Sequence, residues 1–118
     1  MEKIITIDGK QIKFKATANT LRIYRMMFRR DLMVDLTKLS EISQKTNIDI
    51  PDLELFENIA YVMAKQADNS IPDDIGEWLD SFNVFAIREI LPDILALWND
   101  NMHTINTSKK KKQEILGK

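Results

Sequence analysis

Four arginines between residues 22 and 30 are the side chains whose type and spacing most suggest a binding chemistry. At about 100° per residue on a helix, Arg22, Arg25 and Arg29 fall within an arc of about 60°, with Arg30 nearby. Met26 lies on the same basic face, between Arg22 and Arg30, and Ile23 lies at its edge. Arginine and methionine are enriched at protein interfaces, where methionine adapts to varied partners. We therefore predict a protein-binding surface formed by Arg22, Ile23, Arg25, Met26, Arg29 and Arg30.

Two other interpretations of this segment remain open. It is also compatible with a solvated arginine face that carries two scattered apolar residues. A DNA-recognition helix would use the same arginines, but this one has no Asn or Gln among them. The charge balance also disfavours DNA: residues 102–118 hold five lysines and one glutamate, which is +4, so a net charge of −1 leaves −5 on the body.

No other residues have the types and spacing of a catalytic centre. His103 is the single histidine, cysteine is absent, and the three glycines do not cluster as a phosphate-binding loop requires. Two acidic pairs, Asp49 with Asp52 and Asp73 with Asp74, lie at predicted helix starts, where carboxylates oppose the helix dipole. We expect a protein that is not an enzyme and that has no cofactor and no metal site.

The N-terminal segment predicts a β-hairpin over residues 3–15. Ile5, Ile7, Ile12 and Phe14 alternate on either side of an Asp-Gly pair, and glycine accepts the positive φ that a tight turn demands. A lone hairpin is marginally stable in water, so it must pack on another element.

Apolar periodicity predicts helices over about 19–30, 31–45, 50–67, 73–81 and 83–101. Leu21, Tyr24 and Phe28 form the buried face of the first helix, and Asp31 caps the second. Asp35 is expected to form an ordinary surface pair with Lys38. The fold class is therefore α+β, mostly α: a hairpin followed by four to five packed helices.

In the last predicted helix, Pro92 points away from the apolar stripe, so we expect a solvent-side kink without a break. Trp78 and Trp98 lie in register with aliphatic residues and are expected in the core. The 118-residue length fits one globular domain over 1–102, followed by a basic flexible tail over 103–118. No apolar run reaches the roughly 18 residues of a membrane span, and the N-terminus does not resemble a secretion signal. We expect a cytoplasmic protein with no membrane contact.

Several segments, in order along nearly the whole chain, resemble the small tail assembly chaperones of long-tailed, siphovirus-type phages and prophages of Gram-positive bacteria. They are residues 4–17 with the ending Phe14-Lys-Ala-Thr17, then Leu21-Arg-Ile-Tyr-Arg-Met-Met-Phe28, Arg30-Asp31-Leu32, Trp78-Leu-Asp-Ser-Phe82 and Ile90-Leu-Pro-Asp-Ile-Leu-Ala-Leu-Trp98. These are packing patterns and not catalytic signatures. Relatives often have glycine at the position of Arg29, which implies a less sharply turned junction between the first two helices in this chain.

The resemblance implies a chaperone that binds the tape measure protein and keeps it soluble during tail assembly, in the cytoplasm of the bacterial host cell. It also implies a longer product of ribosomal frameshifting that reaches the major tail protein, and the run Lys109–Lys112 fits an adenine-rich slippery site. The underlying codons decide this: interrupted adenines with no overlapping frame would remove the argument. A homo-oligomer is compatible with the sequence.

Two alternatives to the chaperone remain, a small phage DNA-binding regulator and a structural tail-completion subunit. If the predicted surface binds the tape measure protein, Ile23→Asp combined with Met26→Asp should abolish co-purification while the helical circular dichroism is unchanged.

Overall fold

The N-terminal hairpin has the turn that its sequence predicts. The computed structural model describes residues 1–42, 50–83 and 85–99. In it β1 (Glu2–Ile7) pairs antiparallel with β2 (Lys10–Lys15), and Ile7 lies opposite Lys10. Asp8 and Gly9 form the turn between them, with φ of 54° and 78°. Two consecutive positive φ values match the twist of a two-residue hairpin loop, so the hairpin prediction is confirmed.

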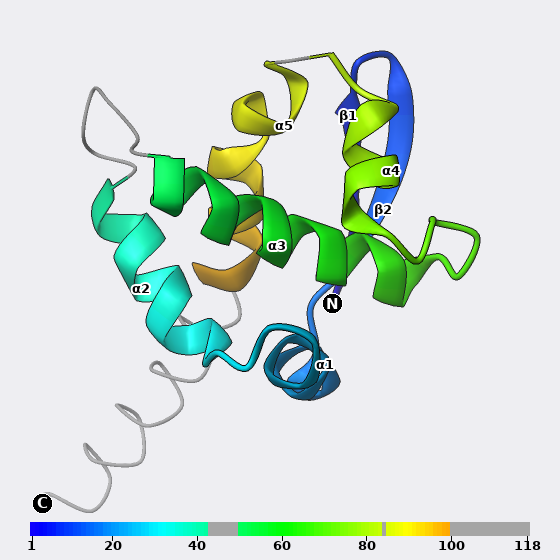
Figure 1. The fold of residues 1–118 in the computed structure, drawn as a ribbon. Coiled ribbons are helices and arrows are strands. Elements are labelled where there is room, and N and C mark those ends of the chain that lie inside the picture. The colour runs from blue at the N-terminus through cyan, green and yellow to red at the C-terminus, as the bar shows by residue number, and fades with distance from the viewer. Residues whose placement is uncertain (43–49, 84, 100–118) are drawn as a thin grey trace, which may run out of the picture.

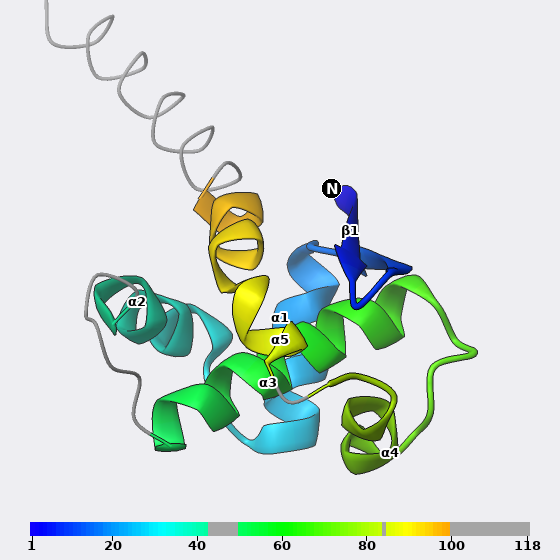
Figure 2. The same cartoon turned by 90° about the horizontal axis from the view of Figure 1, so that it is seen from above.

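The hairpin packs on α3 (Ile50–Ala67), the helix around which the rest of the fold is arranged. Ile5, Ile7 and Phe14 are buried in the same core as the α3 residues Ile59 and Met63. α3 also contacts α1 (Ala18–Phe28), α2 (Leu32–Ile42) and α4 (Ile75–Asp80). Figures 1 and 2 show α3 in green, crossing the middle of the molecule.

The remaining described helices are α5 (Ala86–Glu89) and a helical segment over residues 91–99. The molecule is thus a small α+β fold, mostly helical, with an N-terminal two-stranded antiparallel hairpin followed by about five helices, as predicted. Trp78 and Trp98 are both buried, which confirms their predicted place in the core. Within the described part of the chain, no helix combines the length and the apolar character needed to cross a membrane.

Long-range hydrogen bonds fasten α1 and the hairpin turn to distant parts of the chain. Thr20, which is fully buried, hydrogen-bonds to the Gln66 side chain of α3, and Gln66 Nε2 donates to Thr17 Oγ1 at 2.9 Å. At the hairpin turn, Asn83 Nδ2 donates to Asp8 Oδ1 at 3.0 Å and Lys10 Nζ donates to the Ser81 carbonyl at 2.9 Å. The hydrogen bonds of Gln66 with Thr17 and Thr20 set the position of α1 relative to α3.

The last predicted helix is broken, which corrects the expectation of a kink alone. α5 ends at Glu89, Ile90 adopts a turn conformation with φ of −90° and ψ of 0°, and a new helical segment starts at residue 91. Pro92 therefore lies in the first turn of that segment, where its missing N–H costs little. Within one continuous helix over 86–99, Pro92 would lack the N–H for a bond to the Arg88 carbonyl and its ring would crowd that carbonyl, so a break before Pro92 avoids this cost.

Several predictions fall outside the described residues. They are the end of the second helix beyond Ile42, the Asp49 cap of the third helix, the last two residues of the helix predicted to reach 101, and the whole tail over 103–118 with His103 and Lys109–Lys112.

The junction between α1 and α2 is sharply turned, so the expectation of a more open junction is wrong. Arg29 is left-handed, with φ of 58° and ψ of 37°, and its N–H donates to the Arg25 carbonyl at 2.8 Å. This is the helix-ending position that glycine usually occupies. Asp31 then begins α2: its Oδ1 accepts from the Met33 N–H at 2.9 Å, which confirms the predicted cap.

Arg29→Gly should therefore stabilise the fold. A non-glycine residue in the left-handed region costs about 1–2 kcal/mol, and the glycine variant avoids this cost. Part of the gain is lost because glycine gives the unfolded chain more conformational freedom. We expect the free energy of unfolding to rise by about 0.5–1 kcal/mol in urea denaturation. Arg29→Ala is the control, because it removes the same side chain but keeps the strain. Equal stabilities for the Gly and Ala variants would contradict the argument.

Candidate protein-binding surface

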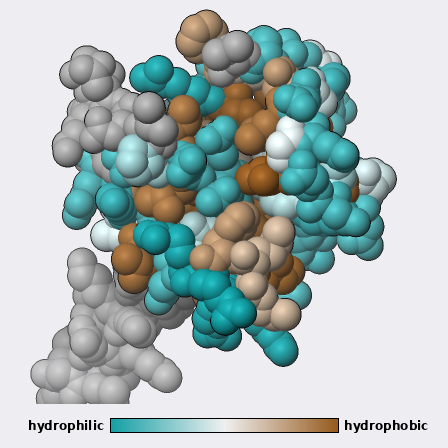
Figure 3. Space-filling view, in the orientation of Figure 1, coloured by the Kyte–Doolittle hydropathy of each residue, from teal (hydrophilic) through white to brown (hydrophobic). Residues whose placement is uncertain are grey.

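The predicted arginine face is exposed on α1. Arg22, Arg25 and Arg29 are all exposed, and Met26 between them keeps 66% of its surface accessible. Among the described residues, none of these three arginine side chains has an ion-pair or hydrogen-bond partner. Figure 3 shows weakly apolar side chains beside strongly hydrophilic ones over the part of the surface where α1 lies. An unpaired basic helix face with an exposed methionine is chemically suited to an apolar partner that carries negative charge.

Ile23 does not belong to this exposed face. Its side chain is half-buried and packs against the hydrophobic core. Met27, further along the same helix, is 45% exposed. A helical wheel gives only the direction of Ile23 around its own helix. How much of α1 is buried depends on the elements that pack against it, so the wheel could not predict the burial of Ile23. The prediction of Ile23 as a contact residue is therefore revised.

Arg30 is held in an internal network. Its Nε donates to Asp35 Oδ2 and its Nη2 to Asp35 Oδ1, both at 2.8 Å, and Tyr24 Oη donates to Asp35 Oδ2 at 2.6 Å. The Asp35 side chain is 1% exposed, whereas that of Arg30 is 47% exposed. The expectation that Asp35 forms a surface pair with Lys38 is thus wrong, because Asp35 points into the corner between α1 and α2. Lys38 Nζ lies 3.7 Å from Asp52 instead.

The electrostatics of this network favour an ionised Asp35 and a neutral Tyr24. Burial acts to raise the pKa of Asp35, but hydrogen bonds from Arg30 and Tyr24 outweigh it and hold the pKa below its usual range. The pKa of Tyr24 is raised well above normal, mainly by burial and then by its bond to the carboxylate. Since Arg30 neutralises Asp35, its guanidinium is engaged within the fold, unlike those of Arg22, Arg25 and Arg29.

Arg25 and Arg29 both line two hollows of the surface. The first, an open hollow of about 500 Å³, is also lined by Leu21, Arg30, Asp31, Leu32 and Met33. A second hollow is lined by Arg25, Met26 and Arg29. The left-handed turn at Arg29 brings the start of α2 beside α1, so the first hollow exists only because the helix ends there. We call Arg22, Arg25, Met26 and Arg29, with these two hollows, the α1 ridge.

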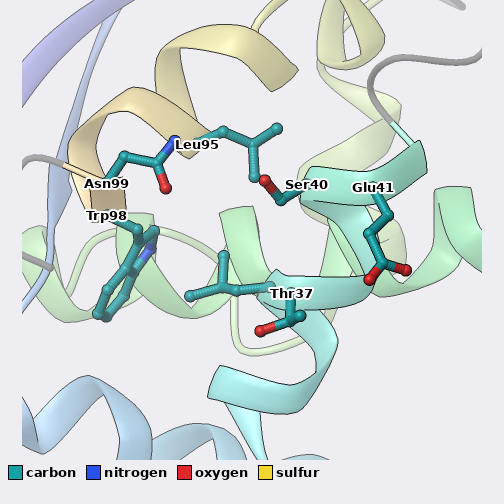
Figure 4. A pocket seen from close by; sticks show the side chains of 7 residues that line it. Thr37, Ser40, Glu41, Leu95, Trp98 and Asn99 are labelled. Atoms are coloured by element: carbon teal, nitrogen blue, oxygen red, sulfur yellow. The ribbon is translucent and has the colours of Figure 1, made fainter.

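A separate hollow lies between α2 and residues 91–99. Figure 4 shows Thr37, Ser40 and Glu41 from α2 facing Leu95, Trp98 and Asn99, and Leu36 completes the lining. The Trp98 indole Nε1 lies 3.1 Å from Met63 Sδ in the core, so its polar group already has a contact. Its described lining carries one charged side chain, the exposed Glu41, and no cluster of charges that would select a ligand.

The acidic residues predicted at helix starts have structural partners where they are described. Asp74 accepts from the Glu77 N–H at 3.1 Å and caps α4, while Asp73 Oδ1 lies 2.9 Å from Lys65 Nζ. The part of the chain that the structure describes holds no group of three or more His, Cys, Asp or Glu side chains that could bind a metal ion. The α1 ridge is therefore the best-supported candidate site.

Comparisons of the chain with protein-family models, with curated proteins and with solved structures give no match.

Proposed function

We propose that this chain is a non-enzymatic tail assembly chaperone, which binds the tape measure protein and keeps it soluble in the cytoplasm of a bacterial host cell. The observation that carries the proposal is the α1 ridge, where Met26 is exposed among three arginines that have no side-chain partner in the described structure. The resemblance of the sequence to phage tail assembly chaperones supplies the identity of the partner.

The chemistry of the ridge suits a chaperone. A long amphipathic partner needs many adaptable contacts of modest strength, which major tail protein later displaces. Methionine re-packs against different apolar side chains, and exposed arginines add contacts that weaken with salt and exchange readily. Several copies along one partner would add avidity without a tight single site. A longer frameshift product would connect this complex to the major tail protein.

Co-expression with the tape measure protein tests the proposal. Met26→Asp combined with Arg25→Glu should abolish co-purification, because it removes the exposed apolar contact and reverses one charge. The variant should keep its helical circular dichroism, since both side chains are exposed. Ile23→Asp is unsuitable for this test, because Ile23 packs against the core and its replacement would perturb the fold.

A matched control is available on α5. Phe85 is 65% exposed and Arg88 is exposed, so Phe85→Asp with Arg88→Glu changes the same kinds of side chain away from the α1 ridge. Asp at the start of α5 is also a favourable helix cap. We expect this control to co-purify normally. If both double variants bind alike, the α1 ridge is not the site.

The two alternative functions make different predictions for the same arginines. A DNA-binding regulator would shift duplex DNA in gels, with affinity that falls steeply as salt rises. A structural tail-completion subunit would be found in finished particles, from which a chaperone should be absent.

A further inference from the structure

The α1 ridge points to the chemical class of its partner segment, an inference that rests on the proposed function. Arg25 and Arg29 lie one helical turn apart, and both line the hollow that also contains Leu21 and Met33 and the hollow beside Met26. Like charges this close repel each other, and no carboxylate of the described chain neutralises them. Asp31 also lines the first hollow, but no ion pair joins it to Arg25 or Arg29, and its Oδ1 accepts from the Met33 N–H at 2.9 Å. The charge that completes the site must come from outside this part of the chain.

We propose that the α1 ridge binds an amphipathic α-helix whose apolar stripe is bordered by acidic side chains one turn apart. Its carboxylates meet Arg25 and Arg29, because carboxylates at i and i+4 on a helix lie on one face. Its apolar side chains contact Met26 and enter the hollow formed with Leu21 and Met33. A segment without the acidic border would leave the two guanidinium groups unpaired on binding.

The surroundings of the ridge favour a protein helix over nucleic acid. Leu21, Met26 and Met33 present apolar surface that a phosphate backbone would not use. Arg30, which could otherwise add a phosphate contact, is bonded to Asp35 at 2.8 Å through two nitrogens.

Two synthetic helical peptides test the proposal. Both carry the same apolar stripe, and one has glutamates at i and i+4 along its border where the other has glutamines. By fluorescence anisotropy at low salt, the protein should bind the glutamate peptide about three- to tenfold more tightly, as expected for two partly exposed ion pairs. The preference should shrink at high salt.

Variants show whether the preference arises at the ridge. Arg25→Gln and Arg29→Gly should each reduce or abolish it, and Arg29→Gly is expected to stabilise the fold, so its loss of binding cannot come from unfolding. Arg88→Gln, which alters an exposed arginine of α5, should keep the full preference. Equal binding of the two peptides, or a preference that survives both ridge variants, would overturn the proposal.

Two further outcomes would overturn it in favour of other occupants. One is duplex DNA that displaces the glutamate peptide with a steeper salt dependence than the peptide itself shows. The other is dimerisation of this chain itself, with light scattering showing dimers for the wild type and monomers for Arg25→Gln. The ridge would then bind a second copy.

The tape measure co-purification experiment separates this inference from the proposed function. A glutamate preference without tape measure binding would retain the acidic-helix site and reject the tape measure protein as partner. Tape measure binding without a glutamate preference would retain the function and reject the acidic helix.

Discussion

Replacing Phe14 by alanine is expected to lower the free energy of unfolding by about 3–5 kcal/mol, the largest effect that we predict for a single substitution. Phe14 has no exposed surface and lies in the core shared by the hairpin and α3. The loss combines the transfer free energy of the ring with the cavity that remains. Because small domains are stable by only about 5–15 kcal/mol, the variant should be close to unfolding at moderate temperature.

Urea denaturation followed by tryptophan fluorescence measures this loss, and hydrogen exchange locates it. Hairpin amides should exchange faster in the variant, because a two-stranded hairpin is marginal once it no longer packs on α3. Phe14→Leu keeps most of the volume and provides a milder variant if the alanine protein does not fold. Ile4→Ala is the control, since Ile4 lies on the neighbouring strand but is 58% exposed. A cost at Phe14 no larger than the cost at Ile4 would contradict the structure.

Replacing Asp35 by alanine should cost about 2–3 kcal/mol. The substitution leaves the buried Tyr24 hydroxyl without its acceptor and removes two hydrogen bonds from Arg30. This cost is smaller than the roughly 3–5 kcal/mol expected when one partner of a fully buried ion pair is removed. Arg30 is 47% exposed, so its guanidinium can be hydrated once Asp35 is gone.

Two variants with smaller expected costs serve as comparisons for Asp35→Ala. Tyr24→Phe should cost about 1 kcal/mol, because the carboxylate keeps both bonds from Arg30. Lys38→Ala should cost less than about 1 kcal/mol, since its side chain is 53% exposed and its pair with Asp52 is long, at 3.7 Å. If Asp35→Ala and Lys38→Ala have equal effects, Asp35 is a surface residue, as its sequence neighbours alone suggested.

The stabilisation from Asp35 should also depend on pH. The pKa of Asp35 is lower in the folded protein than its unfolded value of about 3.9. The unfolded chain therefore takes up the proton first, so the stabilisation is complete above about pH 4 and is lost as pH falls through the folded pKa. Asp35→Asn should lack this dependence, and the difference in stability between it and the wild type should shrink below about pH 4. A constant difference down to about pH 2 would show that Asp35 is not the titrating group.

The hairpin and the helix ridge could be predicted because their signals are local. The Asp-Gly turn needs only the φ preferences of two residues, and Ile5, Ile7 and Phe14 alternate at the period of a strand. Arg22, Arg25, Met26 and Arg29 share a helix face through their spacing alone. The structure places all four on an exposed surface.

The rest of the candidate site depended on contacts between elements. Ile23 and Arg30 belong to the same sequence pattern as the exposed residues, but the neighbouring elements bury most of Ile23, and Asp35 engages Arg30. Gln66 lies 46 residues from Thr20, so no sequence window could reveal their hydrogen bond. The junction at Arg29 was also unexpected, because its left-handed conformation is imposed by packing α2 beside α1 against the preference of the residue itself.

The sequence by itself determined the element types, the turn and the charge of the α1 face, since each follows from periodicity and backbone preference within a few residues. Only the tertiary structure decided which charges stay unpaired. Burial and ion pairing depend on distances between side chains from different elements, and those distances exist only once α1, α2 and α3 have packed together.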